Sequence, residues 1–179
     1  MRPGYSPAHC GVGFSLVELI IVVVIIGVIA AIAVPRFASG ARGADEASLI
    51  GSLSAMRRAI DIYSAEHAGD FPGAKADGAG GGANSAAAFI SQMTKYSDVM
   101  GNVANSRDGA HPFGPYLRRM PPIPVCAHKG SETVAIDAAN SPPLVIPGSD
   151  GWVYNPTTGE IIANCDDPNT DGSRAYDEY

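Results

Sequence analysis

The sequence predicts an α+β protein in which one long N-terminal helix packs on a small C-terminal antiparallel sheet. The helix is expected to have a membrane-spanning half and an amphipathic half. Three observations predict this arrangement: an uninterrupted apolar run, an apolar stripe at helical spacing after it, and short strand-like segments separated by Pro and Gly. A length of 179 residues fits one domain carried on such a helix.

The apolar run begins near the N-terminus. From Phe14 to Val34 only Ser15 and Glu18 are polar. At about 1.5 Å per residue these residues make a helix of roughly 31 Å, which is enough to cross a bilayer core. A carboxylate inside hydrocarbon costs on the order of 3 kcal/mol unless it finds a partner or reaches the headgroups. The run therefore indicates a membrane segment whose one charge, on Glu18, requires a partner.

The helix is expected to continue beyond the membrane as an amphipathic half. One apolar stripe recurs at steps of four, three, four and three residues: Leu49, Leu53, Met56, Ile60 and Tyr63. Gly69 followed by Pro72 predicts the stop. Within the helix, Pro35 removes one backbone hydrogen bond and is expected to produce a kink, and Gly27 is a weak helix former.

After the helix the composition changes. The segment 73–88 consists mostly of Gly, Ala and small polar residues and predicts a flexible or loosely packed loop. A short helix is expected around Phe89, Ile90, Met93 and Tyr96. Strands are predicted at 134–136 and 144–146, and a hairpin at 151–154 and 160–164.

The residues around the start of the apolar run form a motif. Gly13 precedes an aromatic residue, Phe14; Glu18 is the fifth residue counted from Phe14, and Pro35 is the twenty-second. This pattern resembles the prepilin leader shared by type IV pilins and the pseudopilins of type II secretion. The resemblance implies that a prepilin peptidase cuts between Gly13 and Phe14 and that the new N-terminus is methylated.

The physical chemistry of the motif agrees with this resemblance. Cleavage exposes an α-amine on Phe14, which is largely protonated at neutral pH. This amine and Glu18 of a neighbouring helix could pair when helices stack with an axial offset, and pairing in lipid would select the correct register. The resemblance further implies a homo-oligomeric filament, an inner-membrane assembly platform, and local melting between Gly27 and Pro35 on assembly.

The resemblance also implies a division of the chain and a location. We expect a leader, a transmembrane helix, an amphipathic helix half and an extracytoplasmic head with an acidic C-terminal tail: 1–13, 14–35, 36–72 and 73–179. The helix would cross the inner membrane once, in contact with membrane lipid, with the head in the periplasm. A leader with Arg2 as its only basic residue departs from the family pattern.

Two alternatives stay open. The terminal hairpin and the acidic tail favour the secretion-type branch, and the first alternative is a type IV pilus subunit. The second is a single-span, membrane-anchored extracytoplasmic binding module that never polymerises, in which Glu18 only reaches the membrane interface. Replacement of Glu18 distinguishes the two: a filament subunit should lose assembly while it remains inserted, and a lone module should not be affected.

Charge restricts the partners. Without the leader the chain keeps 12 − 1 = 11 basic residues against 18 acidic ones, a net charge of −7. This acidic balance argues against nucleic acid as a partner and suits divalent cations.

The cysteines predict a disulfide. Cys10 leaves with the leader, so Cys126 and Cys165 remain as a pair outside the cytoplasm, where disulfides persist. A disulfide that closes the loop between Cys126 and Cys165 would stabilise the fold by about 4 kcal/mol in the chain-entropy model. Two separate thiols are the alternative, and Cys126, His128 and Cys165 are also a zinc-ligand pattern that lacks a fourth member.

The acidic tail predicts a calcium site. Asp167, Asn169, Asp171 and Glu178 match the spacing of a calcium loop, with a glycine at the turn. A C-terminal calcium site is also what the resemblance to major pseudopilins implies, with Asp166 as a further candidate ligand. A solvated acidic tail is the alternative.

Catalysis is not expected. His67, His111 and His128 have no nucleophile or base partner that the sequence indicates, and no glycine-rich loop has the spacing of a phosphate site. The sequence predicts a structural subunit rather than an enzyme, with calcium as the one candidate cofactor.

Overall fold

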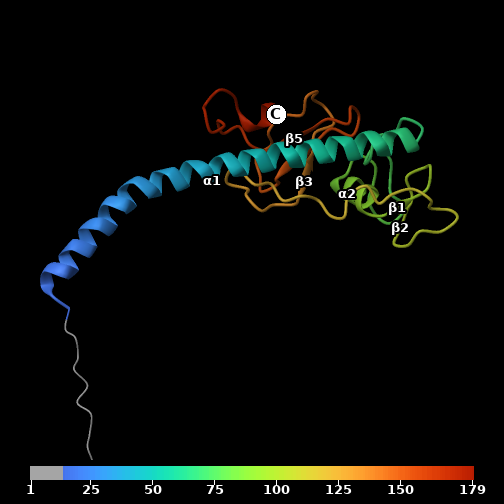
Figure 1. The fold of residues 1–179 in the computed structure, drawn as a ribbon. Helices are drawn as coiled ribbons and strands as arrows, with labels where there is room; N and C mark the ends of the chain where they lie inside the picture. The colour runs from blue at the N-terminus through green and yellow to red at the C-terminus, as the bar shows by residue number, and fades with distance from the viewer. Residues whose placement is uncertain (1–13) are drawn as a thin grey trace, which may run out of the picture. The chain divides into compact units, whose positions relative to one another are not determined.

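A computed structural model describes residues 14–179, and the predicted cleavage position Gly13 and Cys10 lie outside this range. The chain divides into two compact units, Met1–Ala41 and Arg42–Tyr179. The second unit contains the head, in which a helix and short strands lie against the C-terminal half of the long helix (Figure 1).

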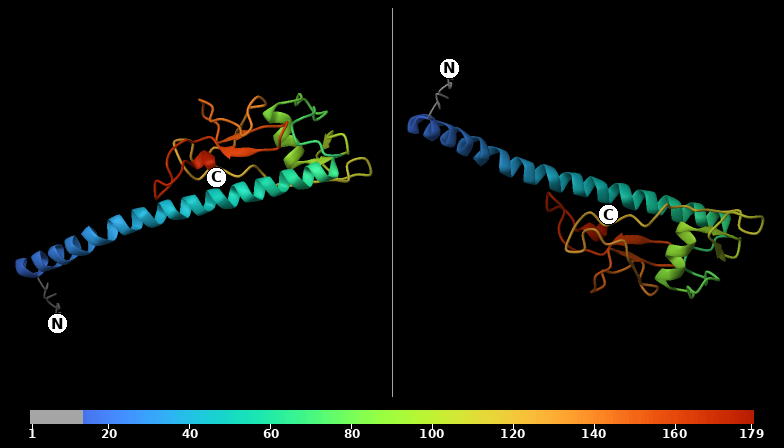
Figure 2. Two further views of the ribbon diagram at one scale, coloured as in Figure 1. Left: turned by 90° about the horizontal axis from the view of Figure 1, so that it is seen from above. Right: turned by 90° about the horizontal axis from the view of Figure 1, so that it is seen from below.

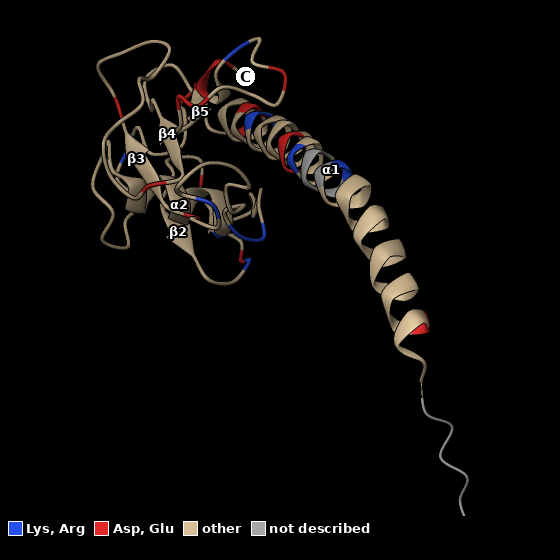
Figure 3. Cartoon of the chain, turned by 90° about the vertical axis from the view of Figure 1, so that its left-hand side faces the viewer, with Lys and Arg blue, Asp and Glu red and all other residues tan. Residues whose placement is uncertain are grey.

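The long helix α1 comprises Leu16–Glu66. The helix continues through Gly27 and Pro35 without interruption. The kink at Pro35 and the melting on assembly stay predictions. Charges are unevenly distributed along α1: one acidic position lies near its beginning, and the other charged positions follow the apolar stretch (Figure 3).

The C-terminus of α1 follows the predicted stop. Ala68 and Gly69 have φ angles of 58° and 90°, and the amide N–H of Gly69 donates to the carbonyl of Ser64 at 2.9 Å. A left-handed residue followed by glycine closes the helix in this way because it satisfies a carbonyl in the last turn. The helix therefore ends within three residues of the predicted position.

The head contains one further α-helix, five short strands and a 3-10 turn. In chain order they are α2 (Ala86–Thr94), β1 (Tyr96–Ser97), β2 (Val103–Ala104), β3 (Val134–Ile136), β4 (Trp152–Tyr154), β5 (Ile161–Ala163) and η1 (Tyr176–Glu178). Both views of Figure 2 show the strands β3 to β5 and α2 along the part of α1 that belongs to the head. The α+β class is confirmed, and α2, β3 and the hairpin of β4 and β5 follow in the predicted order, whereas β1 and β2 were not predicted.

The sheet is mixed rather than purely antiparallel, which corrects one part of the prediction. β4 pairs with β5 in antiparallel orientation through the predicted hairpin, but β3 pairs with β4 in parallel, with Val134 opposite Trp152. The chain between β3 and β4, residues 137–151, is long enough for the crossover that a parallel pair requires. β1 and β2 form a separate antiparallel pair.

The strand predicted at 144–146 is wrong, since this segment lies in the crossover without strand pairing. Its backbone bonds to a side chain instead: the N–H of Ile146 donates to Asn164 Oδ1 at 2.8 Å, and Asn164 Nδ2 donates to the Ile146 carbonyl at 3.0 Å. Prolines at both ends of the segment remove the donors that a ladder needs.

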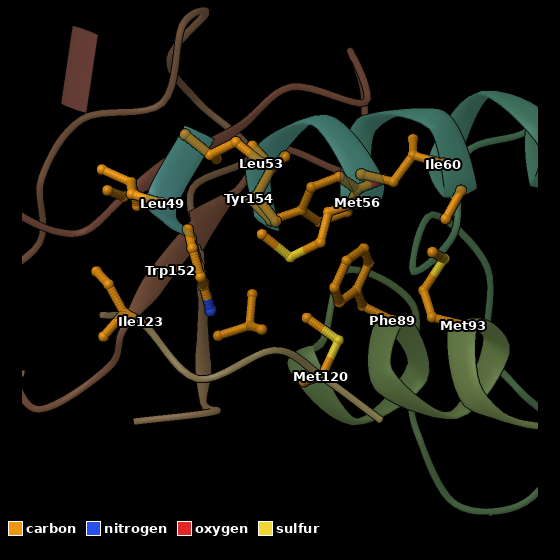
Figure 4. Packing of buried hydrophobic residues seen from close by; sticks show 14 of the residues in the cluster. Leu49, Leu53, Met56, Ile60, Phe89, Met93, Met120, Ile123, Trp152 and Tyr154 are labelled. Carbon is orange, nitrogen blue, oxygen red and sulfur yellow. The ribbon is translucent and has the colours of Figure 1, made fainter. Parts of the chain in front are cut away.

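The core of the head forms between α1, α2 and the sheet. The predicted stripe is buried, with exposed fractions of 0 to 2% for all five side chains. Figure 4 shows Leu53, Met56 and Ile60 facing side chains of the head such as Tyr154 and Phe89, whose ring centroids lie 4.1 Å apart. Full burial of a large apolar side chain contributes about 1.5–3 kcal/mol, so this stripe attaches the helix to the head.

The glycine-rich segment 73–88 is mostly exposed, as expected for a loop, but a few of its positions, Asp77 and Gly81 among them, are buried. Asp77 is 1% exposed, and its Oδ1 accepts from the N–H groups of Ala79 and Gly81, both at 2.8 Å. A Cβ at Gly81 would lie 2.6 Å from the Ala88 nitrogen, so close backbone packing requires glycine at this position.

Candidate functional site

The first candidate surface is the apolar half of α1. The stretch Leu16–Val34 is long and apolar enough to cross a membrane by length and composition, with a mean hydropathy of 3.2. Its large apolar side chains are exposed, from 44% at Val22 to 73% at Leu16. Because apolar side chains surround the helix on all faces, this segment requires lipid or other helices as its environment.

Glu18 lies in the first turn of α1, within this exposed stretch. The helix N-terminus carries a partial positive charge that favours a nearby carboxylate, but this effect is worth only about 0.3–1 kcal/mol at the surface. That is less than the cost of a charge in hydrocarbon, on the order of 3 kcal/mol. In hydrocarbon, Glu18 would therefore need either a partner from outside the helix or contact with the headgroups.

The second candidate surface is the C-terminal tail, residues 166–179, which bonds to α1 at several points while its carboxylates Asp166, Asp167, Asp171 and Glu178 are exposed. Arg57 of α1 donates from Nη1 to the Tyr179 carbonyl at 2.7 Å and from Nη2 to the Ile161 carbonyl at 3.1 Å. The guanidinium is half-buried, and burial lowers the pKa of Arg57 while the nearby Glu160 carboxylate opposes this shift. One side chain thus connects α1, β5 and the tail.

Glu46 makes a further connection between α1 and the tail. Its carboxylate accepts from the Tyr179 hydroxyl and, at 3.2 Å, from the N–H of Thr170. These two hydrogen bonds hold the pKa of Glu46 below its usual value. The guanidinium of Arg174 lies 3.6 Å above the Tyr179 ring centroid, a cation–π contact. Sequence reasoning missed the contacts of Arg57 and Glu46 with the tail, because these two side chains are charged and lie outside the apolar stripe.

Three of the four predicted calcium ligands accept hydrogen bonds from backbone N–H groups within the tail. Asn169 is buried, and its Oδ1 accepts from the Ser173 N–H at 2.9 Å; Asp171 Oδ1 accepts from the same group at 2.9 Å. Glu178 Oε2 accepts from the Ala175 N–H at 3.2 Å. In the part of the chain that the structure describes, Asp167, Asp171 and Glu178 do not bring three ligand atoms within 4.8 Å of one another. Calcium binding stays a prediction.

Cys126 and Cys165 are joined in a disulfide, with their Cα atoms 6.4 Å apart. Asp167 lies beside this bond: both sulfurs and a carboxylate oxygen of Asp167 are within 4.8 Å of one another. The structure therefore places one of the predicted calcium ligands at the cysteines.

The three histidines occupy different surroundings. His67 is buried; its Nδ1 lies 2.8 Å from the Tyr63 carbonyl and its Nε2 lies 3.0 Å from Ser97 Oγ. This serine contact was not predicted, and both residues are at most 1% exposed. His111 bonds to Asp108 at 2.9 Å on the surface, and His128 lines a hollow beside the disulfide. The histidine–serine contact is part of the core.

The chain is similar to pilin and pseudopilin subunits. It is 44% identical over 57 residues to the type IV narrow pilus major component PilA5 of Thermus thermophilus, which covers 32% of this chain and 49% of that protein. It is 37% identical over 51 residues to the type II secretion system core protein G of Escherichia coli and of Klebsiella pneumoniae. That stretch is 28% of this chain and 35% and 36% of the two relatives.

The chain thus spans about half, or less, of the length of the curated relatives it matches. No protein-family model matches it, and no solved structure matches it either. The predicted resemblance to pilins and pseudopilins is confirmed by these relatives, which are filament and secretion-system components by name.

Proposed function

We propose that this chain is a subunit of a helical filament, in which the apolar half of α1 forms the filament core. The observation that carries the proposal is the exposed apolar stretch Leu16–Val34 with the one carboxylate of Glu18 in its first turn. Lateral packing of identical helices would cover the apolar surface that the head leaves exposed.

The partner of Glu18 would be a neighbouring subunit. Cleavage after Gly13 would place a positively charged amine on Phe14, four residues before Glu18. Between packed helices the alternative to pairing is an unpaired carboxylate, so only the axial offset that joins amine and carboxylate is favourable. A prepilin peptidase and an inner-membrane assembly platform are the partners that this route requires.

Before assembly the same stretch would hold the subunit in the inner membrane, with the head in the periplasm. The tail connections of Arg57 and Glu46 and the buried stripe fix the head to its end of α1. Extraction of the apolar half into a filament would therefore leave the head intact.

The secretion-type branch is the first choice, because two relatives are type II secretion core proteins and the terminal hairpin and acidic tail are those predicted for it. The pilus branch is the second choice, and the 44% identity to a pilus component favours it. Growth of filaments with either assembly machine, supplied separately, distinguishes the two.

The deciding experiment replaces Glu18 with Ala in cells that contain the peptidase and the assembly machine. We expect the variant to be inserted and processed but to form no filaments by electron microscopy. The matched control is Asp61→Ala, which removes an exposed carboxylate of the same helix outside the apolar stretch and should assemble normally. Normal filaments from the Glu18 variant would contradict the pairing, and absence of filaments from unmodified protein would favour the lone anchored module.

Processing is tested by intact mass and N-terminal sequencing of the protein extracted from membranes. A chain that starts at Phe14, with or without an added methyl group, supports the proposed route. A chain that retains Gly13 in these cells contradicts it.

A further inference from the structure

The neighbourhood of the disulfide has the composition of a metal site once the sulfur–sulfur bond is absent. The two sulfurs and an Asp167 carboxylate oxygen lie within 4.8 Å of one another. In a tetrahedral zinc site, with Zn–S near 2.3 Å and Zn–O near 2.1 Å, ligand atoms are roughly 3.6–3.8 Å apart. Small side-chain rotations therefore suffice to place all three atoms around one ion.

The backbone that carries Cys126 is held by its own hydrogen bonds. The Gly130 N–H donates to the Ile123 carbonyl at 2.7 Å, and the Lys129 N–H donates to the Cys126 carbonyl at 3.2 Å. These bonds close the loop on both sides of the cysteine, so its position does not depend on the disulfide alone.

Cys165 and Asp167 are held in the same manner. Cys165 follows β5 directly after Asn164, whose side-chain amide donates to the carbonyls of Ile146 and Asp150. The Asp167 carbonyl accepts from the Tyr176 N–H at 3.0 Å. The three candidate ligands thus lie on backbone that the head supports from separate elements.

Cys126 has a backbone conformation that is costly for its residue type. Its φ angle is +66°, in the left-handed region that a non-glycine residue rarely adopts. Residues held in such a conformation cost about 1–3 kcal/mol and are concentrated at functional sites. Here the strained backbone directs one sulfur toward Cys165 and Asp167.

The site is reachable from solvent. A hollow beside the disulfide is lined by both cysteines, His128 and Asp167. Cys165 is 5% exposed, whereas the Asp167 side chain is exposed, so an ion could approach from the side of the carboxylate. The His128 ring is not in the group within 4.8 Å, so the structure replaces His128, the ligand suggested by sequence, with Asp167.

The donor set selects the metal class. Two thiolates favour zinc and other thiophilic ions, whereas calcium takes six to eight oxygen ligands. One carboxylate in addition to two thiolates gives three protein ligands, and water occupies the fourth tetrahedral position.

We propose that the chain without its disulfide binds one Zn²⁺ through Cys126, Cys165 and Asp167, and that the zinc state and the disulfide state exclude each other. The newly made chain already has two thiols. The oxidised chain reaches this state when a dithiol gives two electrons and two protons to the sulfurs and itself becomes a disulfide. Binding of Zn²⁺ then releases the two thiol protons to solvent. This inference does not depend on the proposed filament function.

The test uses the full chain with Cys10→Ser, so that Cys126 and Cys165 are its two cysteines, in detergent, reduced without oxygen and then freed of reductant. Zn²⁺ is titrated in competition with a chromogenic chelator, and Co²⁺ reports thiolate ligands by its sulfur-to-metal charge-transfer absorption. We expect one equivalent of either metal to bind the reduced chain and none to bind the oxidised chain. Absence of binding to the reduced chain overturns the proposal, whether or not circular dichroism shows it folded.

Variants test the ligands one at a time. Asp167→Asn should weaken Zn²⁺ binding by more than about tenfold, since loss of an outer-shell partner already costs about 10–100-fold. Cys126→Ser should abolish the charge-transfer band. The matched controls are Asp166→Asn, the adjacent carboxylate, and His128→Ala, and both should bind as the unmodified chain does. Equal weakening by Asp166→Asn and Asp167→Asn, or loss of binding in His128→Ala, overturns the assignment.

Discussion

The two halves of α1 are both rich in apolar residues, but only the second half finds its partners within the chain. In Leu16–Val34 the apolar side chains lie on every face and are exposed; in the second half they form one stripe, Leu49 to Tyr63, that is at most 2% exposed. One stripe can be covered by one small sheet and a short helix. A helix that is apolar all round cannot be covered by a single head, and it requires lipid or many copies of itself.

The charges of the two halves differ in the same way. In the head-bearing half, Arg57 and Glu46 bond to the tail of the same chain. In the apolar half, Glu18 is the one acidic residue, and under the proposed filament function its partner belongs to a neighbouring subunit. The comparison indicates that α1 combines a folding element with an assembly element.

The largest expected effect comes from truncating the buried stripe. Leu53→Ala should lower the free energy of unfolding of the head by about 2–5 kcal/mol, because it leaves a cavity between α1 and the sheet. Denaturant unfolding followed by fluorescence of Trp152, the one tryptophan of the chain and fully buried, measures this change.

The matched variant is Ile25→Ala in the exposed half, which removes a similar side chain. It should leave the unfolding midpoint of the head unchanged. If both variants destabilise the head equally, the division of α1 into a folding half and an assembly half is wrong.

A smaller effect is expected from the tail connection. Arg57→Met should cost about 1–3 kcal/mol, because the carbonyls of Ile161 and Tyr179 lose their donor. The control is Arg58→Met, the next residue of the helix, which is exposed and should change stability by less than about 0.5 kcal/mol. Thermal unfolding of the three proteins at equal ionic strength provides the comparison.

The next prediction concerns the effect of Ca²⁺ on the stability that the tail contributes to the head. If the tail binds Ca²⁺ through Asp167, Asn169 and Asp171, Ca²⁺ at ten times its Kd should stabilise the folded chain by about 1.4 kcal/mol. Chelation should reverse the shift in Tm, and Asp171→Asn should remove it. An unchanged Tm at millimolar Ca²⁺ would mean that the tail keeps its hydrogen-bonded loop and does not bind Ca²⁺.

The smallest effect is a pH dependence within the glycine-rich loop. Burial raises the pKa of Asp77, but hydrogen bonds from Ala79 and Gly81 outweigh it, so the pKa lies below its ordinary value of 3.8. The unfolded chain therefore binds this proton more readily. The contribution of Asp77 is complete above about pH 5 and is lost as pH falls through the folded-state pKa.

Asp77→Asn keeps the acceptor oxygen and removes the charge, so its stability should fall less steeply than that of the unmodified chain below about pH 5. Denaturant midpoints measured from pH 7 to pH 3 provide the test. Parallel curves for the two proteins would show that the charge of Asp77 contributes nothing.

Local pattern predicted the elements whose residues carry a strong periodic or turn signal. The stripe from Leu49 to Tyr63, the stop at Gly69 and the terminal hairpin are of this kind, since each depends on neighbours a few residues apart. The strand at 144–146 had an apolar signal too, but its backbone bonds to Asn164, eighteen residues away from Ile146. Only the fold brings these two together.

The candidate sites divide along the same line. The motif of Phe14, Glu18 and the apolar run can be read from residue order, because its chemistry depends on position along one helix. The placement of Asp167 at the cysteines and of Arg57 at the tail could not be predicted, because hydrogen bonds and sulfur contacts join residues distant in the chain. The sequence by itself determined that the stretch Leu16–Val34 requires a membrane or other helices around it. Tertiary structure alone decided which charged groups the head satisfies internally, since burial and distance exist only once the chain has folded.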